Sequence, residues 1–169
     1  IEVAVSDTDV DNFKKVVGKF FRFFADEEMP KFIGEIKEEL IDPYEVVMES
    51  ENGNWFIIED KSDYWHRSHN NSHAIMGRVH YPIDPHALNL DQFEEDGVNI
   101  SQLQQLVQQD NVYIRFNIGE LKLHHSRESL EYNKATQKQI FETLKSVFSE
   151  IQEIAKEKLG NADDLWDAK

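Results

Sequence analysis

Two neighbouring stretches decide the fold: VYIRFNIGELKL at residues 112–123 and QIFETLKSVFSEIQEI at residues 139–154. In the first, apolar and polar residues alternate, which predicts two β-strand segments or one strand with a bulge. In the second, apolar residues recur at steps of four and three, at positions 140, 144, 147, 151 and 154. This spacing predicts a long amphipathic helix, with Gly160 as its expected C-terminal end.

An amphipathic helix is also predicted near the start of the chain, over residues 9–24. Its apolar residues lie at helical spacing and are Val10, Phe13, Val16, Val17, Phe20, Phe21 and Phe24. We expect this stripe to be buried against the core, and the alternative is a surface that binds a partner. A second, short helix is expected over residues 28–40, interrupted by Pro30 and Gly34.

The middle of the chain has the features of strands. Asn52-Gly53 is a strong hairpin signal and predicts a turn between the strands Tyr44–Glu49 and Trp55–Glu59. Polar residues 61–72 indicate a loop. Residues 73–84 predict one further strand that contains Gly77, at a bulge or a close approach of the backbone.

Irregular structure is expected over residues 86–98, followed by a short helix that is marked by Ile100, Leu103, Leu106 and Val107 and ended by Gln109-Asp110-Asn111. Strands interleaved with helices that each have one apolar side are typical of an α+β domain. We therefore predict a two-layer sandwich in which a mixed sheet carries helices on one face.

Composition excludes several classes of function. The chain has 18 Lys and Arg against 33 Asp and Glu, a net charge of −15, which disfavours general binding to nucleic acid. No apolar run approaches the roughly 20 residues of a membrane span. Without cysteine, thiolate metal sites and disulfides are excluded. We expect a cytoplasmic protein, and the strand-like alternation of residues 1–5 predicts that the chain was cut from a longer polypeptide.

Five histidines lie within 21 residues: His66, His69, His73, His80 and His86. Neutral imidazoles bind zinc, nickel and copper, so the cluster is a candidate metal site. Its spacing fits no established site, and surface histidines are the simpler interpretation.

The candidate catalytic residue is Arg127, in the stretch between the predicted strand and the long helix. Residues 111–145 around it carry six basic and four acidic side chains, a local charge of +2. An arginine in a tight turn before a helix can point a fixed guanidinium at a phosphate across a domain boundary, as an arginine finger does. The alternative is that Arg127 only pairs with Glu128 or Glu131.

The motif Ser-Arg-Glu-x-Leu-x-x-Asn-Lys at residues 126–134 resembles the middle-domain segment of the ninety-kilodalton heat-shock chaperone. In that family the arginine reaches the terminal phosphate of ATP bound by the N-terminal domain. The strand-like Leu121-Lys122-Leu123 leads into the motif. Glu131 departs from the family, which has a glutamine there, and a carboxylate would oppose the triphosphate unless it pairs with a cation.

A second resemblance covers residues 73–145 and is to the region after the ATPase domain in rIIA-type rapid-lysis protector proteins of T-even-like phages. The residues that carry it are Ala74-Ile75-x-Gly77, Tyr81-Pro82-Ile83-Asp84, Asn111-Val112-x-Ile114 with Phe116 and Gly119, and Ser126-Arg127-Glu128 with Leu130. Both families belong to the GHKL ATPases. The resemblance therefore implies the second, transducer domain, with the left-handed βαβ fold of small-ribosomal-subunit protein five, domain two.

This resemblance implies three regions. Residues 1–25 would be the end of the upstream ATPase domain and its connecting helix, residues 26–160 the transducer-like domain and residues 161–169 an acidic tail. The N-terminal domain of the same polypeptide would be the partner that binds Mg-ATP. The isolated chain, with no cofactor of its own, is expected to be inactive, while the parent protein hydrolyses ATP.

The resemblance also implies the site residues. Arg127 would act on the γ-phosphate, and Ser126 would contribute to the phosphate contacts. Lys122, Lys134 and Lys138 are auxiliary candidates because they lie nearby in the sequence, and solvated lysines are the alternative for all three.

Two other functions stay open. In the first, the acidic segment 26–51, with a net charge of −8, and the aromatic helix bind a host or phage protein, and Arg127 is structural. In the second, the charge of −15 mimics nucleic acid and blocks a DNA-binding protein. A homodimer is a further candidate assembly.

Overall fold

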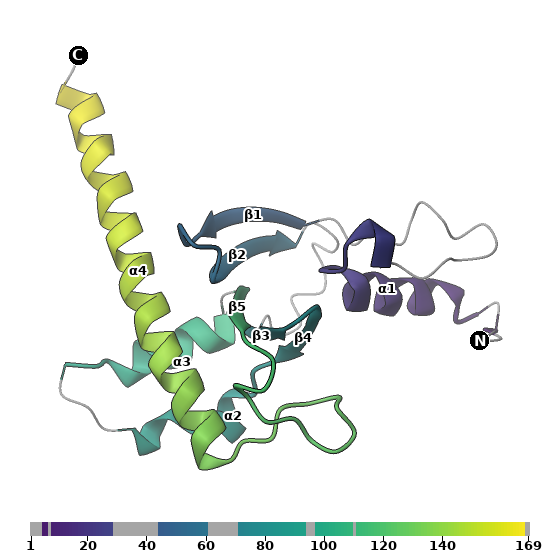
Figure 1. The fold of residues 1–169 in the computed structure, drawn as a ribbon. Coiled ribbons are helices and arrows are strands. Elements are labelled where there is room, and N and C mark those ends of the chain that lie inside the picture. The colour runs from purple at the N-terminus through teal and green to yellow at the C-terminus, as the bar shows by residue number, and fades with distance from the viewer. Residues whose placement is uncertain are drawn as a thin grey trace.

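The structure is a computed structural model that describes residues 5–6, 8–28, 44–60, 71–93, 97–109 and 111–167. Its centre is a five-stranded sheet with the order β1-β2-β5-β3-β4 (Figure 1). The strands are β1 (Tyr44–Glu49), β2 (Trp55–Asp60), β3 (His73–Met76), β4 (Val79–Pro82) and β5 (Val112–Phe116). Neighbouring strands are antiparallel except β3 and β5, which are parallel, so the sheet is mixed.

The helices complete the predicted α+β class, which is confirmed. They are α1 (Val10–Phe21), α2 (Pro85–Leu88), α3 (Ile100–Gln109) and α4 (Lys134–Asp167), with 3-10 turns η1 (Asp26–Glu28) and η2 (Leu90–Gln92). The long α4 crosses the sheet beside α3, whereas α1 extends away on the other side (Figure 1). In the described part of the chain, no helix has the length and apolar character needed to cross a membrane.

Alternation along the strands divides the apolar side chains between two faces of the sheet. The larger cluster joins Trp55 and Ile114 to α3 and α4, whose buried residues include Leu103 and Leu144. A smaller cluster on the opposite face consists of Phe56, Ile58, Ile75 and Tyr113 and is covered by Phe23, which follows α1. Phe23, in the segment that follows α1, therefore covers the sheet face opposite α3 and α4.

The two hairpins show how turn chemistry acts. The Asn52-Gly53 turn joins β1 and β2 as predicted, and Gly53 has φ 68°. The single strand predicted over residues 73–84 is instead a hairpin, because Met76 pairs with Val79 across a two-residue turn. Gly77 begins this turn with φ 64°, a left-handed conformation that glycine adopts without steric cost. Gly77 is therefore a turn residue, and its interpretation as a bulge was wrong.

Other element boundaries also differ from the predictions. Residues expected to be irregular form α2 and η2. Leu121–Leu123 is not a strand of the sheet, since only Leu123 forms an isolated bridge, to Leu130. α4 continues through Gly160 to Asp167, so the expected C-terminal end was wrong. The helix expected over residues 28–40 and most of the loop expected over residues 61–72 lie outside the described residues.

The apolar stripe of α1 is less buried than expected. Gly18 is the one residue of this helix that is fully buried. Val16 is 59% exposed and Phe20 is 46% exposed. The expectation of a buried core face was therefore wrong for these two residues.

Candidate functional site

The candidate site is the loop that joins β5 to α4. The two sides of the loop approach each other at an isolated antiparallel bridge between Leu123 and Leu130, and the Glu131 amide donates a hydrogen bond of 2.8 Å to the Lys122 carbonyl. Closer to the tip, the His124 amide donates to the Ser129 carbonyl at 3.0 Å. Leu130 is only 2% exposed, so it anchors the base of the loop in the core. The loop is therefore a closed hairpin with residues 125–128 at its tip.

Arg127 lies at this tip in a left-handed backbone conformation, with φ 60°. Its amide donates a hydrogen bond of 2.8 Å to the His124 carbonyl, which closes the turn. A left-handed residue other than glycine costs about 1 kcal/mol or more, so hydrogen bonds around it must hold it there. The loop thus fixes the direction in which the backbone presents the arginine.

The Arg127 side chain is exposed, and within the part of the chain that the structure describes it has no ion pair or hydrogen bond. Arg127 therefore pairs with neither Glu128 nor Glu131, and the alternative interpretation is wrong. Glu131 pairs with Lys122 instead, with 3.0 Å between Nζ and Oε1. This hydrogen bond and the charge of Lys122 lower the pKa of the Glu131 carboxyl.

The ion pair changes the interpretation of both partners. Lys122 is the cation that a carboxylate near a triphosphate requires. The glutamate that stands in place of the chaperone family's glutamine therefore does not leave an unpaired negative charge in the loop. Lys122 is engaged at the base of the loop, on the segment that enters it. It would have to leave Glu131 in order to bind a phosphate.

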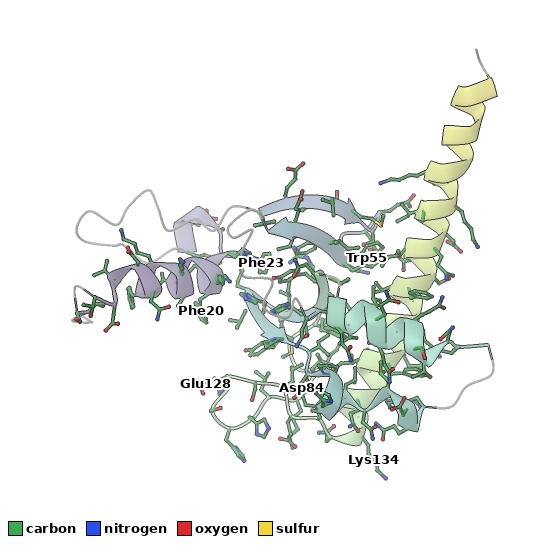
Figure 2. The ribbon with its side chains drawn as sticks, turned by 180° about the vertical axis from the view of Figure 1, so that it is seen from behind. Phe20, Phe23, Trp55, Asp84, Glu128 and Lys134 are labelled. Carbon is green, nitrogen blue, oxygen red and sulfur yellow. The ribbon has the colours of Figure 1, made fainter. Side chains whose placement is uncertain are left out.

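Ser126 and Lys134 differ in their distance from the arginine. Ser126 is exposed beside Arg127, and its Oγ accepts a long hydrogen bond of 3.5 Å from the Glu128 amide. Lys134 is exposed at the first residue of α4. Figure 2 shows Glu128 at the far end of the loop and Lys134 well apart, at the base of the helix. The structure therefore places Ser126 with Arg127 and does not bring Lys134 to the tip.

Three contacts fix the base of the loop to the body of the protein. Asn133 caps α4, because its Oδ1 accepts a hydrogen bond of 2.9 Å from the Thr136 amide. The buried Thr136 in turn accepts, through Oγ1, a bond of 3.1 Å from the Lys122 amide. The Tyr132 hydroxyl accepts a bond of 2.7 Å from the Asp84 amide, and burial raises the pKa of Tyr132 to about 12. An exposed tip thus stands on an anchored base.

The histidine cluster is divided by the fold. His73 and His80 lie together on the sheet face that Phe23 covers, with ring centroids 5.3 Å apart. Burial is the main cause that lowers the pKa of each to about 4, and neither Nδ1 has a hydrogen-bond partner. His86 is exposed on α2, and His66 and His69 lie outside the described residues.

Surface histidines were therefore the wrong interpretation for His73 and His80. The described residues contain no group of three or more His, Asp or Glu side chains that could hold a metal ion.

A cleft that the sequence did not indicate lies between one end of the sheet and α4. It has a volume of about 560 Å³ and is lined mainly by polar residues, among them Asn54, Arg115, Gln139 and Glu150. Glu150 accepts a hydrogen bond of 2.8 Å from the Trp55 indole on its wall. The lining comes from segments far apart in the chain and no local motif joins them, so sequence reasoning had no signal for it.

Comparisons with known proteins add no family assignment. No family model matches the chain, and no match was found among curated proteins or solved structures. The function is therefore inferred from the geometry of the loop together with the sequence motif that it carries.

Proposed function

We propose that this chain is the second, transducer domain of a phage or prophage GHKL-type ATPase in the bacterial cytoplasm. In this proposal Arg127 contacts the γ-phosphate of ATP held by the N-terminal domain of the same polypeptide. The observation that carries the proposal is the exposed Arg127 side chain, which has no charged partner in the described part of the chain. Such a guanidinium keeps its full charge and its fork of donors for an anion.

The anchored base of the loop supports this role. An arginine finger acts by stabilising the charge that develops on the transferred phosphoryl group, so its position must be set before the phosphate arrives. Here backbone hydrogen bonds, the buried Leu130 and the Asn133 cap hold the loop. Mg-ATP would be held by the upstream domain, and this chain would supply the cation.

The remaining candidates receive different roles. Ser126 is close enough in the chain to donate its hydroxyl to the same phosphate. Lys122 supports the loop through Glu131. Lys134 and Lys138 are exposed on the first turns of α4 and add positive charge near the base of the loop. We therefore expect Arg127 to dominate and these lysines to have smaller effects.

The test is ATP hydrolysis by the complete parent protein, with wild type compared with Arg127→Ala and Arg127→Lys. Arginine fingers contribute about 10³–10⁵ in rate in other phosphoryl-transfer enzymes. We expect a loss of kcat of about 10²-fold or more for Arg127→Ala, with nucleotide affinity changed much less. Arg127→Lys should recover only a small part of the activity, because a lysine cannot form the two-pronged contact.

Arg78→Ala is the matched control, because Arg78 is a surface arginine whose Nε lies 2.9 Å from Glu28. It should hydrolyse ATP like the wild type. If Arg127→Ala and Arg78→Ala have the same kcat and the same nucleotide affinity, the proposal is wrong.

One observation favours a second candidate function, a protein-interaction module. Val16 and Phe20 of α1 are 59% and 46% exposed, and neighbouring exposed apolar residues are a feature of interaction sites. If a host or phage protein binds the parent equally well with ATP, with a non-hydrolysable analogue and without nucleotide, the module gains support over the transducer.

A further inference from the structure

The carboxylate of Glu150, on α4, lies in the cleft between this helix and one end of the sheet. Its Oε2 accepts a hydrogen bond of 2.8 Å from the buried Trp55 indole, and its Oε1 accepts one of 3.2 Å from the Ser146 hydroxyl. Figure 2 shows Trp55 at the end of the sheet next to α4. Within the residues that the structure describes, no cation pairs with Glu150. The two donors therefore fix the carboxylate and leave its charge available to a ligand.

Two further charged residues of the described chain line this cleft, Glu120 and Arg115. Glu120 is exposed and, like Glu150, forms no ion pair within that part of the chain. Strand residues alternate between faces, and Phe116 belongs to the cluster under α4, so the Arg115 side chain points to the opposite face. Its guanidinium lies there, 5.2 Å from the centre of the Phe56 ring. The side of the cleft toward α4 is therefore negatively charged.

Apolar side chains lie beside these carboxylates. The lining includes Trp55, Phe116 and Val147, each at most 6% exposed. Ile118 also lines the cleft and is 85% exposed, the largest exposed fraction among the large apolar residues of the described ranges. The volume of about 560 Å³ is typical of sites for small ligands. The cleft thus combines negative charge with apolar surface, which suits an aliphatic cation.

We propose that this cleft binds an aliphatic chain with primary ammonium groups, one of which pairs with Glu150. An ammonium is a compact cation with three donors, so it can bond a carboxylate whose two oxygens each already accept one hydrogen bond. A planar guanidinium is less suited, because its two-pronged contact needs both oxygens free on one side. Glu120 would receive a second ammonium, and the stem would cover part of Ile118.

This binding goes beyond the proposed ATPase role and does not depend on it. None of residues 122–131, which form the closed loop around Arg127, lines the cleft. A free polyamine and a lysine side chain of a partner protein share the chemistry of an ammonium on an aliphatic stem. The experiment below distinguishes these two sources.

Isothermal titration calorimetry of the full chain with spermidine, at constant ionic strength, measures the affinity. We expect a Kd between about 10 µM and 1 mM, as a ligand of this size provides. The N–H resonance of the Trp55 indole in ¹⁵N NMR spectra reports the place of binding, because this group donates to Glu150. Tetramethylammonium carries a charge without N–H donors, so at the same ionic strength it should leave that resonance in place.

Glu150→Gln removes the charge but keeps an oxygen that can accept the Trp55 hydrogen bond. It should weaken spermidine binding about tenfold or more. Glu153→Gln makes the same change at an exposed position of α4 outside the cleft, so it is the matched control and should bind like the wild type. Glu120→Gln should weaken binding only about threefold, because Glu120 is exposed. Circular dichroism and urea unfolding show whether each variant retains the fold.

N-acetyl-lysine N-methylamide, which carries a single ammonium, distinguishes the sources. Binding at least as tight as that of spermidine would identify a lysine side chain of a partner protein as the occupant. Weaker binding would identify a free polyamine, because only a polyamine can reach Glu120 and Glu150 together.

Three results would overturn the proposal. The first is a failure of spermidine to bind in the millimolar range. The second is the same affinity for spermidine in Glu150→Gln, Glu153→Gln and the wild type, which would make the role of Glu150 purely structural. The third is an equal shift of the Trp55 resonance with tetramethylammonium, which would reduce the effect to general screening of charge.

Discussion

Acidification from pH 7.5 to pH 5.5 is expected to lower the free energy of unfolding, because His73 and His80 are held neutral in the fold. Their Nδ1 atoms are buried without hydrogen-bond partners. The cations Lys19 and Arg22 lie near enough to disfavour a further positive charge. No carboxylate is among the groups that shift either pKa.

The sign follows from proton linkage. The pKa of each imidazole is lowered from 6.5 to about 4, so below about pH 6.5 the unfolded chain binds more protons than the folded one. The free energy of unfolding therefore has its full value, as far as these two groups are concerned, above pH 6.5, and it decreases as the pH falls toward 4. Below pH 4 both states are protonated and the loss levels off.

The magnitude follows from the same two values. For one group with these folded and unfolded pKa values, lowering the pH from 7.5 to 5.5 reduces the free energy of unfolding by about 1 to 2 kcal/mol. Both rings are only partly buried, and the charge of His80 accounts for part of the lowered pKa of His73. We therefore expect about 2 kcal/mol for the pair rather than twice the single value.

Urea unfolding at pH 7.5, 6.5 and 5.5, followed by tryptophan fluorescence, measures the effect. Trp55 is a suitable reporter because it is 1% exposed. Wild type should lose about 2 kcal/mol more than His73→Gln/His80→Gln over this range. His124→Gln/His125→Gln, which changes two exposed loop histidines, is the matched control and should follow the wild type. Equal pH dependence in wild type and in the His73/His80 variant would refute the reasoning.

Two further predictions concern the arginine loop and use urea unfolding at neutral pH. Leu130→Ala removes a buried side chain at the base of the loop and should lower the free energy of unfolding by about 2–4 kcal/mol. Arg127→Ala removes an exposed side chain and should change it by less than about 0.5 kcal/mol. Similar losses for the two variants would contradict the anchored base. Asn133→Ala removes the side-chain cap of α4 and should cost about 1 kcal/mol, and Asn133→Ser should retain most of that stability; equal stability of wild type and Asn133→Ala would show that the cap contributes nothing.

Local signals predicted the elements that depend on local chemistry. The Asn52-Gly53 turn and the strands on either side of it formed as expected, because a turn of this kind favours a local hairpin. The turn at Gly77 was missed because residues with extended character lie on both sides of its two residues, so the stretch looks like one strand. Only the pairing of Met76 with Val79 reveals the reversal.

The remaining errors have physical causes of the same kind. Gly160 lowers helix propensity by only about 1 kcal/mol, which does not end a helix unless the chain also turns there. Leu121–Leu123 alternates like a strand, but Leu123 finds its partner within the same loop. The burial of α1 was overestimated because periodicity identifies an apolar side without showing whether anything covers it.

The place of Arg127 in the loop before α4 could be predicted from the sequence, whereas its surroundings could not. The motif and its position before α4 directed attention to Arg127, but the absence of an ion pair between Arg127 and Glu131 depends on Lys122, which pairs with Glu131 from nine residues away in the chain. That pairing requires the loop to close, which spacing alone does not indicate. For the same reason Lys134, which is close to Arg127 in sequence, lies apart from the loop tip in space (Figure 2).

The start of α4 directly after the loop has a mechanical consequence. The helix has 34 residues and would be about 50 Å long at 1.5 Å per residue. Its buried residues, from Ile140 to Val147, pack in the core near the loop, so a tilt of the helix would pivot about them. The portion beyond Ile154 extends about 20 Å further. A tilt of about 5° about these residues would therefore move the C-terminal end of α4 by roughly 2 to 3 Å. A displacement of the loop would thus produce a larger displacement at the C-terminal end of the helix.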